Sequence, residues 1–122
     1  MIQQMAWLGL VVKDIPVATE FYTKKLGLTL DEAESIPNMY SQFVTQGGAL
    51  LGLIPGFEQE GINQPFDTAF MVADVDAAYI QWQTAGVEMV SEPHDMPFGR
   101  TFLFHTPDGQ VLRVMSRPST NN

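Results

Sequence analysis

Two repeated modules predict an α+β fold for this chain of 122 residues. Residues 10–15 read Leu-Val-Val-Lys-Asp-Ile and residues 70–75 read Phe-Met-Val-Ala-Asp-Val, and each block opens a helical stretch that ends in a glycine. The glycine-led blocks at 48–53 and 109–114 form a second pair. The offsets, 60 from residue 10 to 70 and 61 from residue 48 to 109, agree, so the repeat unit is a module of about sixty residues.

The first module is predicted to run in the order strand, helix and three strands. Residues 5–12 are apolar and typical of a buried strand. Asp14 is suited to cap a helix that ends at Gly27, because its side chain can accept from the first helical N–H groups. Further strands are expected at 28–33, 39–45 and 49–54, the last two joined by a Gly47-Gly48 hairpin turn.

The second module repeats this order. A strand at 67–72 precedes a helix capped by Asp74, and strands follow at 87–91, 100–105 and 111–115 around a loop at 92–99. We therefore expect one domain over residues 1–122, with module one at 1–54, a linker at 55–65, module two at 66–115 and a loose tail at 116–122.

Composition narrows the classes of function. Fourteen acidic against six basic side chains give a net charge of −8, so nucleic acid is a poor partner. No apolar run reaches the roughly 20 residues of a membrane-spanning helix, and the start lacks the features of a signal peptide. The absence of cysteine excludes disulfides and thiolate metal sites, and a cytoplasmic protein is the plain interpretation. The acidity could attract small cations, although keeping the protein soluble is the commoner role.

Six motifs spread over nearly the whole chain point to one family. They are Val11-Val12-Lys13-Asp14, Phe21-Tyr22, Leu26-Gly27-Leu28, Val72-Ala73-Asp74-Val75-Asp76, Pro97-Phe98-Gly99-Arg100 and Pro107-Asp108-Gly109-Gln110. The chain resembles the vicinal oxygen chelate superfamily, which includes glyoxalase I, extradiol dioxygenases and bleomycin resistance proteins. The resemblance implies two tandem βαβββ modules whose mixed sheet forms a cup around a ligand, with helices on the outer face, commonly in a homodimer.

The resemblance also shows where metal ligands would stand in the enzymes of the family. Those positions hold Trp7 and Asp67 on the first strands of the modules, and Gly52 and Arg113 on the last. Only Asp67 offers a metal-binding oxygen. A guanidinium at 4 Å from a divalent ion would be repelled by about 8 kcal/mol at an effective dielectric constant of 20. A metal centre and a cofactor are therefore not expected, and Asp67 and Arg113 could instead form a structural pair.

Strand alternation sorts the remaining side chains. If Trp7 faces the cup, then Gly52 and Ile54 do so from the same module, while Phe70 and Val72 pack under the helix of the other module. The lining is then largely apolar and suits a planar or hydrophobic molecule held by a few polar contacts. The predicted ligand-binding residues are Trp7, Gly52, Ile54, Asp67, Met71, Phe98, Arg100, Arg113 and Met115.

Several of these residues have a plainer interpretation. Trp7 could be a stacking plate for a ligand or a plug that fills the volume of a lost metal. Arg100 could bind an anionic group, but a salt bridge that braces its loop is the default explanation. His94 and His105 lie away from the family's ligand positions, so satisfied imidazoles are favoured over a ligand or base. No nucleophile with an adjacent base is recognisable, and no catalytic residue is assigned.

The function that these features favour is a metal-free protein that sequesters a small organic molecule, in the manner of the bleomycin resistance proteins, which bind a bulky cationic antibiotic. The acidic patch that supports a cationic ligand consists of Asp31, Glu32, Glu34, Glu58 and Glu60. The alternative is a lyase, isomerase or dioxygenase of the same superfamily, either metal-dependent or using Asp67 or His105 as a base. Whether the chain is an enzyme is left open, with the binding protein preferred.

Overall fold

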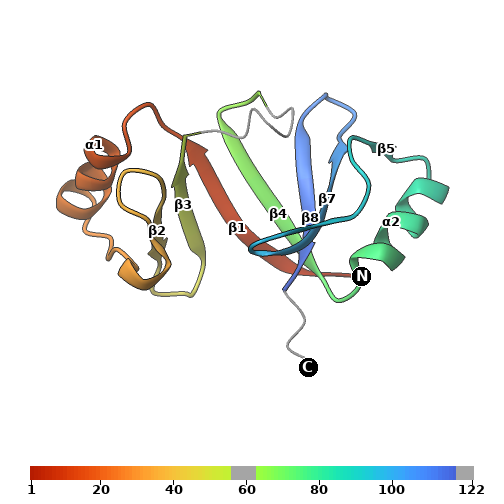
Figure 1. Cartoon of the computed structure of the whole chain (residues 1–122), viewed down its shortest axis with the longest axis horizontal. Helices are drawn as coiled ribbons and strands as arrows, with labels where there is room; N and C mark the ends of the chain where they lie inside the picture. The colour runs from red at the N-terminus through yellow and green to blue at the C-terminus, as the bar shows by residue number, and fades with distance from the viewer. Residues whose placement is uncertain (56–62, 118–122) are drawn as a thin grey trace. The chain divides into compact units, whose positions relative to one another are not determined.

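The computed structural model describes residues 1–55 and 63–117, and within them it contains eight strands and two α-helices (Figure 1). The strands are β1 (Ile2–Val11), β2 (Ser41–Val44), β3 (Leu50–Ile54), β4 (Phe66–Val72), β5 (Glu88–Met89), β6 (His94–Met96), β7 (Gly99–His105) and β8 (Val111–Ser116). The helices are α1 (Ile15–Glu20) and α2 (Val75–Thr84), with a π-helical segment η1 (Phe21–Lys25) and a 3-10 turn η2 (Glu32–Glu34). The predicted α+β class is confirmed, and none of the helices described is long and apolar enough to cross a membrane.

The contacts divide the chain into two compact units, each described by itself below. The first unit comprises residues 7–67, and the second comprises residues 1–6 together with those from 68 onward. This division falls close to the predicted linker at 55–65, except that the start of β1 belongs to the second unit. Residues 56–62 of the linker and 118–122 of the tail lie outside the described residues, so the predicted module boundaries stay predictions.

In the first unit, the strands lie in the order β2-β3-β1. β3 pairs with β1 in parallel and with β2 antiparallel, which places Gly9 beside Gly52. Asp14 caps α1 as predicted, since its Oδ1 accepts from the N–H of Val17 at 2.9 Å. The helix is anchored by the buried Ile15, which packs with Phe43, Leu53 and neighbouring apolar side chains on one face of the strands.

The strand predicted at 28–33 is not formed. Only an isolated bridge between Leu30 and Phe43 occurs there, and η2 follows it. The physical reason is a set of local hydrogen bonds that replaces a strand ladder. The Ser35 hydroxyl donates to the carbonyl of Asp31 at 2.7 Å and accepts from the N–H of Gln42 at 3.0 Å.

In the second unit, the strands lie in the order β4-β8-β7-β5, and β6 pairs with β7. The pairing is mixed, because β4 and β8 are parallel while β7 is antiparallel to its neighbours. β6 was missed by the sequence prediction, which placed a loop at 92–99. Three residues bounded by prolines at 93 and 97 give too short a pattern to recognise as a strand.

The helix of the second unit covers one face of its strands, as the alternation predicts. Asp74 caps α2 by accepting from the N–H of Ala77 at 3.0 Å, and the chain leaves the helix at Gly86 with a positive φ of 97°. Trp82 is partly buried and packs edge-on against the rings of Phe102 and Phe104, so its indole contributes to the core. The cluster between α2 and the strands is formed by Phe70, Val72, Val75, Ala78, Phe102, Phe104 and Val114.

Candidate functional site

Trp7 of β1 lies flat against the backbone of the first unit. The two glycines beside it, Gly9 and Gly52, are register partners on adjacent parallel strands. A Cβ placed on either glycine would overlap the indole, and the three nearest atoms at each position all belong to Trp7. One face of the ring therefore rests on bare backbone at close range, which any other residue pair would prevent.

The edge of the same indole is held by a tyrosine 33 residues away in the sequence. The Trp7 Nε1–H donates to the hydroxyl of Tyr40 at 3.0 Å, and Tyr40 in turn donates to Oε1 of Gln42 at 2.7 Å. The Gln42 amide reaches Asp31 at 3.5 Å. The ring is thus fixed in both tilt and rotation by contacts within its own unit.

The hydroxyl of the half-buried Tyr40 lies near two carboxylates, those of Glu34 and Asp31. Burial is the largest effect and raises the pKa of its hydroxyl above the ordinary value, and the carboxylates of Glu34 and Asp31 act in the same direction. The hydrogen bond from Trp7 opposes them. The hydroxyl therefore stays protonated and continues to donate to Gln42. Sequence reasoning missed Tyr40 and Gln42, although their i, i+2 spacing on a predicted strand places both on one face.

On the second unit, the predicted residues Met71, Arg113 and Met115 share the sheet face that does not carry α2. Met71 is the register partner of Met115 in the parallel β4–β8 pair, and Arg113 is two residues before it. The Arg113 side chain is only 2% exposed, and its guanidinium lies 5.3 Å from the centroid of the Phe98 ring. An arginine over an aromatic face is stabilised by the electrons of the ring. The structure therefore brings four of the predicted residues together on this face.

A buried hydroxyl also contacts this arginine. Arg113 Nη1 donates to Thr101 Oγ1 at 3.4 Å, and Thr101 donates to the carbonyl of Val114 at 2.7 Å. The guanidinium is thereby oriented from β7 as well as from the loop that carries Phe98.

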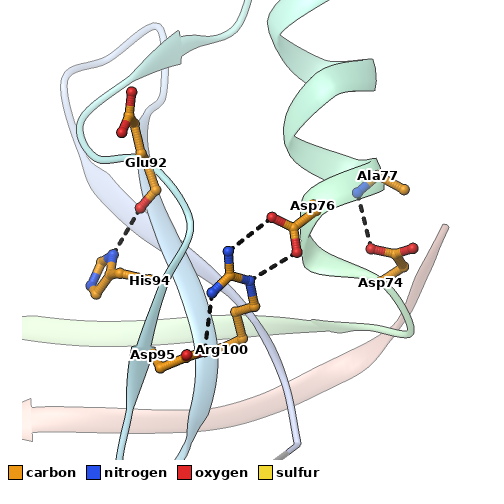
Figure 2. A network of polar contacts seen from close by, with 7 residues as sticks. All are labelled: Asp74, Asp76, Ala77, Glu92, His94, Asp95 and Arg100. Carbon is orange, nitrogen blue, oxygen red and sulfur yellow. Dashed lines mark hydrogen bonds and ion pairs between the residues drawn. The ribbon is translucent and has the colours of Figure 1, made fainter.

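Arg100 lies on the opposite face, where its side chain bridges two elements (Figure 2). Its Nε and Nη2 donate to both carboxylate oxygens of Asp76 on α2, at 2.8 and 3.0 Å. Nη1 donates to Asp95 of β6 at 3.1 Å. The loop-bracing salt bridge, which the sequence offered as the default, is the arrangement found, and Arg100 does not join Arg113.

The pairing of Arg100 makes stability depend on pH in the acid range. The hydrogen bonds from Arg100 hold the pKa of Asp76 below its ordinary value. A carboxyl whose pKa is lowered on folding stabilises the protein above its unfolded pKa of about 4, and this stabilisation disappears as the pH falls through the folded value.

We expect Asp76→Asn to lower the urea midpoint at pH 7 and to make little difference at pH 2.5. Glu92→Gln, an exposed loop carboxylate in the same unit, is the matched control. An equal loss for Asp76→Asn at both pH values would contradict this account.

The other candidate residues are placed as follows. Ile54 is 3% exposed at the end of β3, and Asp67 is 1% exposed on β4. His105 Nε2 lies 3.5 Å from Glu88, and His94 Nδ1 lies 2.8 Å from the carbonyl of Glu92, which agrees with satisfied imidazoles. In the acidic patch, Glu32 and Glu34 belong to η2 and Asp31 precedes it, whereas Glu58 and Glu60 lie outside the described residues.

Three of the four residues at the family's ligand positions, all except Asp67, offer no ligand to a metal ion. Trp7 has used its only polar atom as a donor to Tyr40, Gly52 has no side chain, and Arg113 is a buried cation. Within residues 1–55 and 63–117, no group of three or more His, Cys, Asp or Glu side chains is placed to hold an ion. What the arrangement offers instead is a fixed aromatic plate on one unit and a face of methionine, arginine and phenylalanine on the other.

Comparison with known proteins shows the family to which the chain belongs. Residues 4–114 match the family model of the Glyoxalase/Bleomycin resistance protein/Dioxygenase superfamily, and the chain belongs to this family. The resemblance found in the sequence motifs is therefore confirmed.

Among individual relatives, the chain is 28% identical over 116 residues to the phenazine antibiotic resistance protein EhpR of Enterobacter agglomerans, covering 84% of each chain. It is 29% identical to the uncharacterized protein YetH of Bacillus subtilis, covering 92% of this chain and 97% of that protein. A solved structure described as an NAD-dependent benzaldehyde dehydrogenase from Legionella pneumophila is 26% identical with a TM-score of 0.74, covering 91% of this chain and 97% of that one.

Proposed function

We propose that the chain is a metal-free binding protein that sequesters a small organic molecule with a planar aromatic part. The observation that carries this proposal is the Trp7 indole, seated on Gly9 and Gly52 and held at its edge by Tyr40. The named activity of the relative EhpR, resistance to a phenazine antibiotic, supports it, because a phenazine is a flat, fused aromatic ring system.

A fixed indole is well suited to stacking. Aromatic pairs contribute about 0.5–1.5 kcal/mol beyond the burial of their area. Because Trp7 is already immobilised by its own unit, little side-chain freedom is lost when a ligand ring docks. Its only donor is engaged with Tyr40, so selection by this residue would rest on ring shape rather than on hydrogen bonding.

The second unit, taken by itself, carries a face of a different kind. Met71 and Met115 are flexible and polarisable, which suits irregular apolar ligands. Arg113 places a buried positive charge on the same face as these methionines. Phe98 is 36% exposed and keeps accessible surface beside the arginine. Following the family resemblance, the proposal includes a homodimer in the cytoplasm.

The test uses the two tryptophans, which are the only ones in the chain. Trp82→Phe leaves Trp7 as the sole tryptophan, and Trp7→Phe leaves Trp82, a partly buried residue of α2 that packs against the core cluster. We expect phenazine to quench the emission of the Trp82→Phe protein and to raise its melting temperature. In the Trp7→Phe protein we expect weak quenching and an affinity reduced about three- to tenfold, corresponding to roughly 1 kcal/mol of lost stacking.

Two outcomes would contradict the proposal. One is the absence of both quenching and thermal stabilisation with phenazine and with bleomycin, the planar and the cationic probe. The other is one divalent transition metal per chain, measured by elemental analysis of protein purified without an affinity tag, which would favour the enzyme alternative.

A further inference from the structure

The first unit carries a surface cavity of about 540 Å³ on the side of α1. Its volume is within the range of about 300–1,000 Å³ that is usual for small-molecule sites. It lies between the helical residues 15–24 and the segment 30–41. Among the residues that are hydrogen-bonded in series to Trp7, only Tyr40 lines it. The residues around it are Ile15, Pro16, Thr19, Glu20, Thr23, Lys24, Leu30, Glu32, Ser35, Pro37, Asn38, Tyr40 and Ser41.

Most hydroxyl groups of this cavity already donate their hydrogen bonds to other protein atoms. Thr23 donates to the carbonyl of Thr19 at 2.9 Å, Ser35 to the carbonyl of Asp31 at 2.7 Å, and Tyr40 to Gln42 at 2.7 Å. A hydroxyl has one donor hydrogen and two acceptor lone pairs, so what it can still offer is an acceptor. The polar part of the wall therefore favours a ligand that donates hydrogen bonds.

The charge of the cavity favours the same kind of ligand. Glu20 and Glu32 line it against a single cation, Lys24, whose Nζ lies 3.7 Å from Glu20. Their side chains reach the solvent, so an ion pair formed with a ligand would be modest in strength. Two more carboxylates, Asp31 and Glu34, are close enough to influence Tyr40. The net field at this place is negative.

The helical wall has an irregular backbone. Thr19 and Glu20 come from the end of α1, whereas Thr23 and Lys24 come from the π-helical segment η1. The N–H of Leu26 donates to the carbonyl of Phe21 at 3.2 Å, the i→i+5 bond of a π-helix. Such segments are rare and occur often at functional sites.

We propose that this cavity binds a small organic cation, with an ammonium group among the acceptors and carboxylates and a short apolar body against Ile15, Leu30 and Pro37. The site shares only Tyr40 with the Trp7 network, and its occupancy can be tested without a ligand at Trp7.

Benzylammonium is a suitable probe, with benzoate and benzyl alcohol as its anionic and neutral counterparts. We expect isothermal titration to show millimolar binding of benzylammonium that weakens with salt, and tenfold weaker or no binding of the other two. Glu32→Gln should weaken benzylammonium binding about threefold, and Glu20→Gln with Glu32→Gln about tenfold, because partly exposed ion pairs are lost. Lys24→Gln should strengthen it about twofold, because a competing cation is removed. Glu92→Gln, the same charge change in the second unit, is the control.

The direction of the changes in benzylammonium affinity tests whether the cavity binds a cation. Equal binding of all three probes, or no binding of benzylammonium, would overturn the proposal. So would binding that Glu20→Gln with Glu32→Gln leaves unchanged or that Lys24→Gln weakens. Trp7→Phe should leave benzylammonium binding intact, so the result is independent of the phenazine experiment.

Discussion

Gly99→Ala is expected to destabilise the protein by about 3 kcal/mol or more, measured as the free energy of unfolding in urea. Gly99 has a φ of 144°, which side-chain-bearing residues rarely adopt. A Cβ there would also overlap the carbonyl oxygen of Ser116, a backbone atom on the neighbouring strand β8. A backbone atom in a paired strand cannot move aside as the end of a flexible side chain can. Strain and overlap therefore add.

Two further alanine substitutions separate these contributions. Gly109→Ala has a φ of 87° but nothing within 4 Å of its Cβ, so it should cost only about 1–2 kcal/mol of conformational strain. Gly47→Ala has neither feature and should change stability by less than about 0.5 kcal/mol. If Gly99→Ala were no more destabilising than Gly109→Ala, the close approach to Ser116 would not constrain the fold.

Gly52→Ala is expected to destabilise the protein by about 1–3 kcal/mol and to weaken phenazine binding about tenfold. The new methyl group would occupy the place of the indole, forcing Trp7 off the strand and away from Tyr40. The loss of the fixed ring should appear as a red shift of Trp7 emission in the Trp82→Phe background. Urea unfolding and the phenazine titration measure the two effects.

A double-mutant cycle with Trp7→Ala tests the cause. Because the three nearest atoms to the added Cβ all belong to Trp7, Gly52→Ala should cost less than about 0.5 kcal/mol once the indole is gone. A cost that is the same in both backgrounds would show that the strand, rather than the ring, rejects the methyl group.

Features encoded over short stretches could be predicted from the sequence. Asp14 and Asp74 were recognised as helix caps because a cap depends only on the next three residues. Alternation correctly assigned Phe70 and Val72 to the helix-covered face of the second unit. The strand at 28–33 was predicted wrongly, because hydrogen bonds of Ser35 and Gln42 compete with strand pairing there. The alternation of apolar residues does not reveal these bonds, because they depend on the turn that brings Ser35 beside both Asp31 and Gln42.

In the candidate site, too, some residues could be predicted from the sequence and others could not. Trp7 and Arg113 were proposed from the family's ligand positions, and Met71 and Met115 from strand alternation, but Tyr40 was not found. The bond between Trp7 and Tyr40 joins residues 33 positions apart, and only the β1–β3–β2 pairing brings their strands together. The signal in the sequence was the i, i+2 spacing of Tyr40 and Gln42, which places both side chains on one face of a predicted strand.

The distribution of the two tryptophans has a consequence for folding. Trp7 belongs to the unit of residues 7–67 and Trp82 to the other, so each half carries its own intrinsic optical reporter. Single-tryptophan proteins can therefore follow the denaturation of either half alone. Coincident transitions would mean that the halves melt as one cooperative block, and separated transitions would reveal a half-folded intermediate.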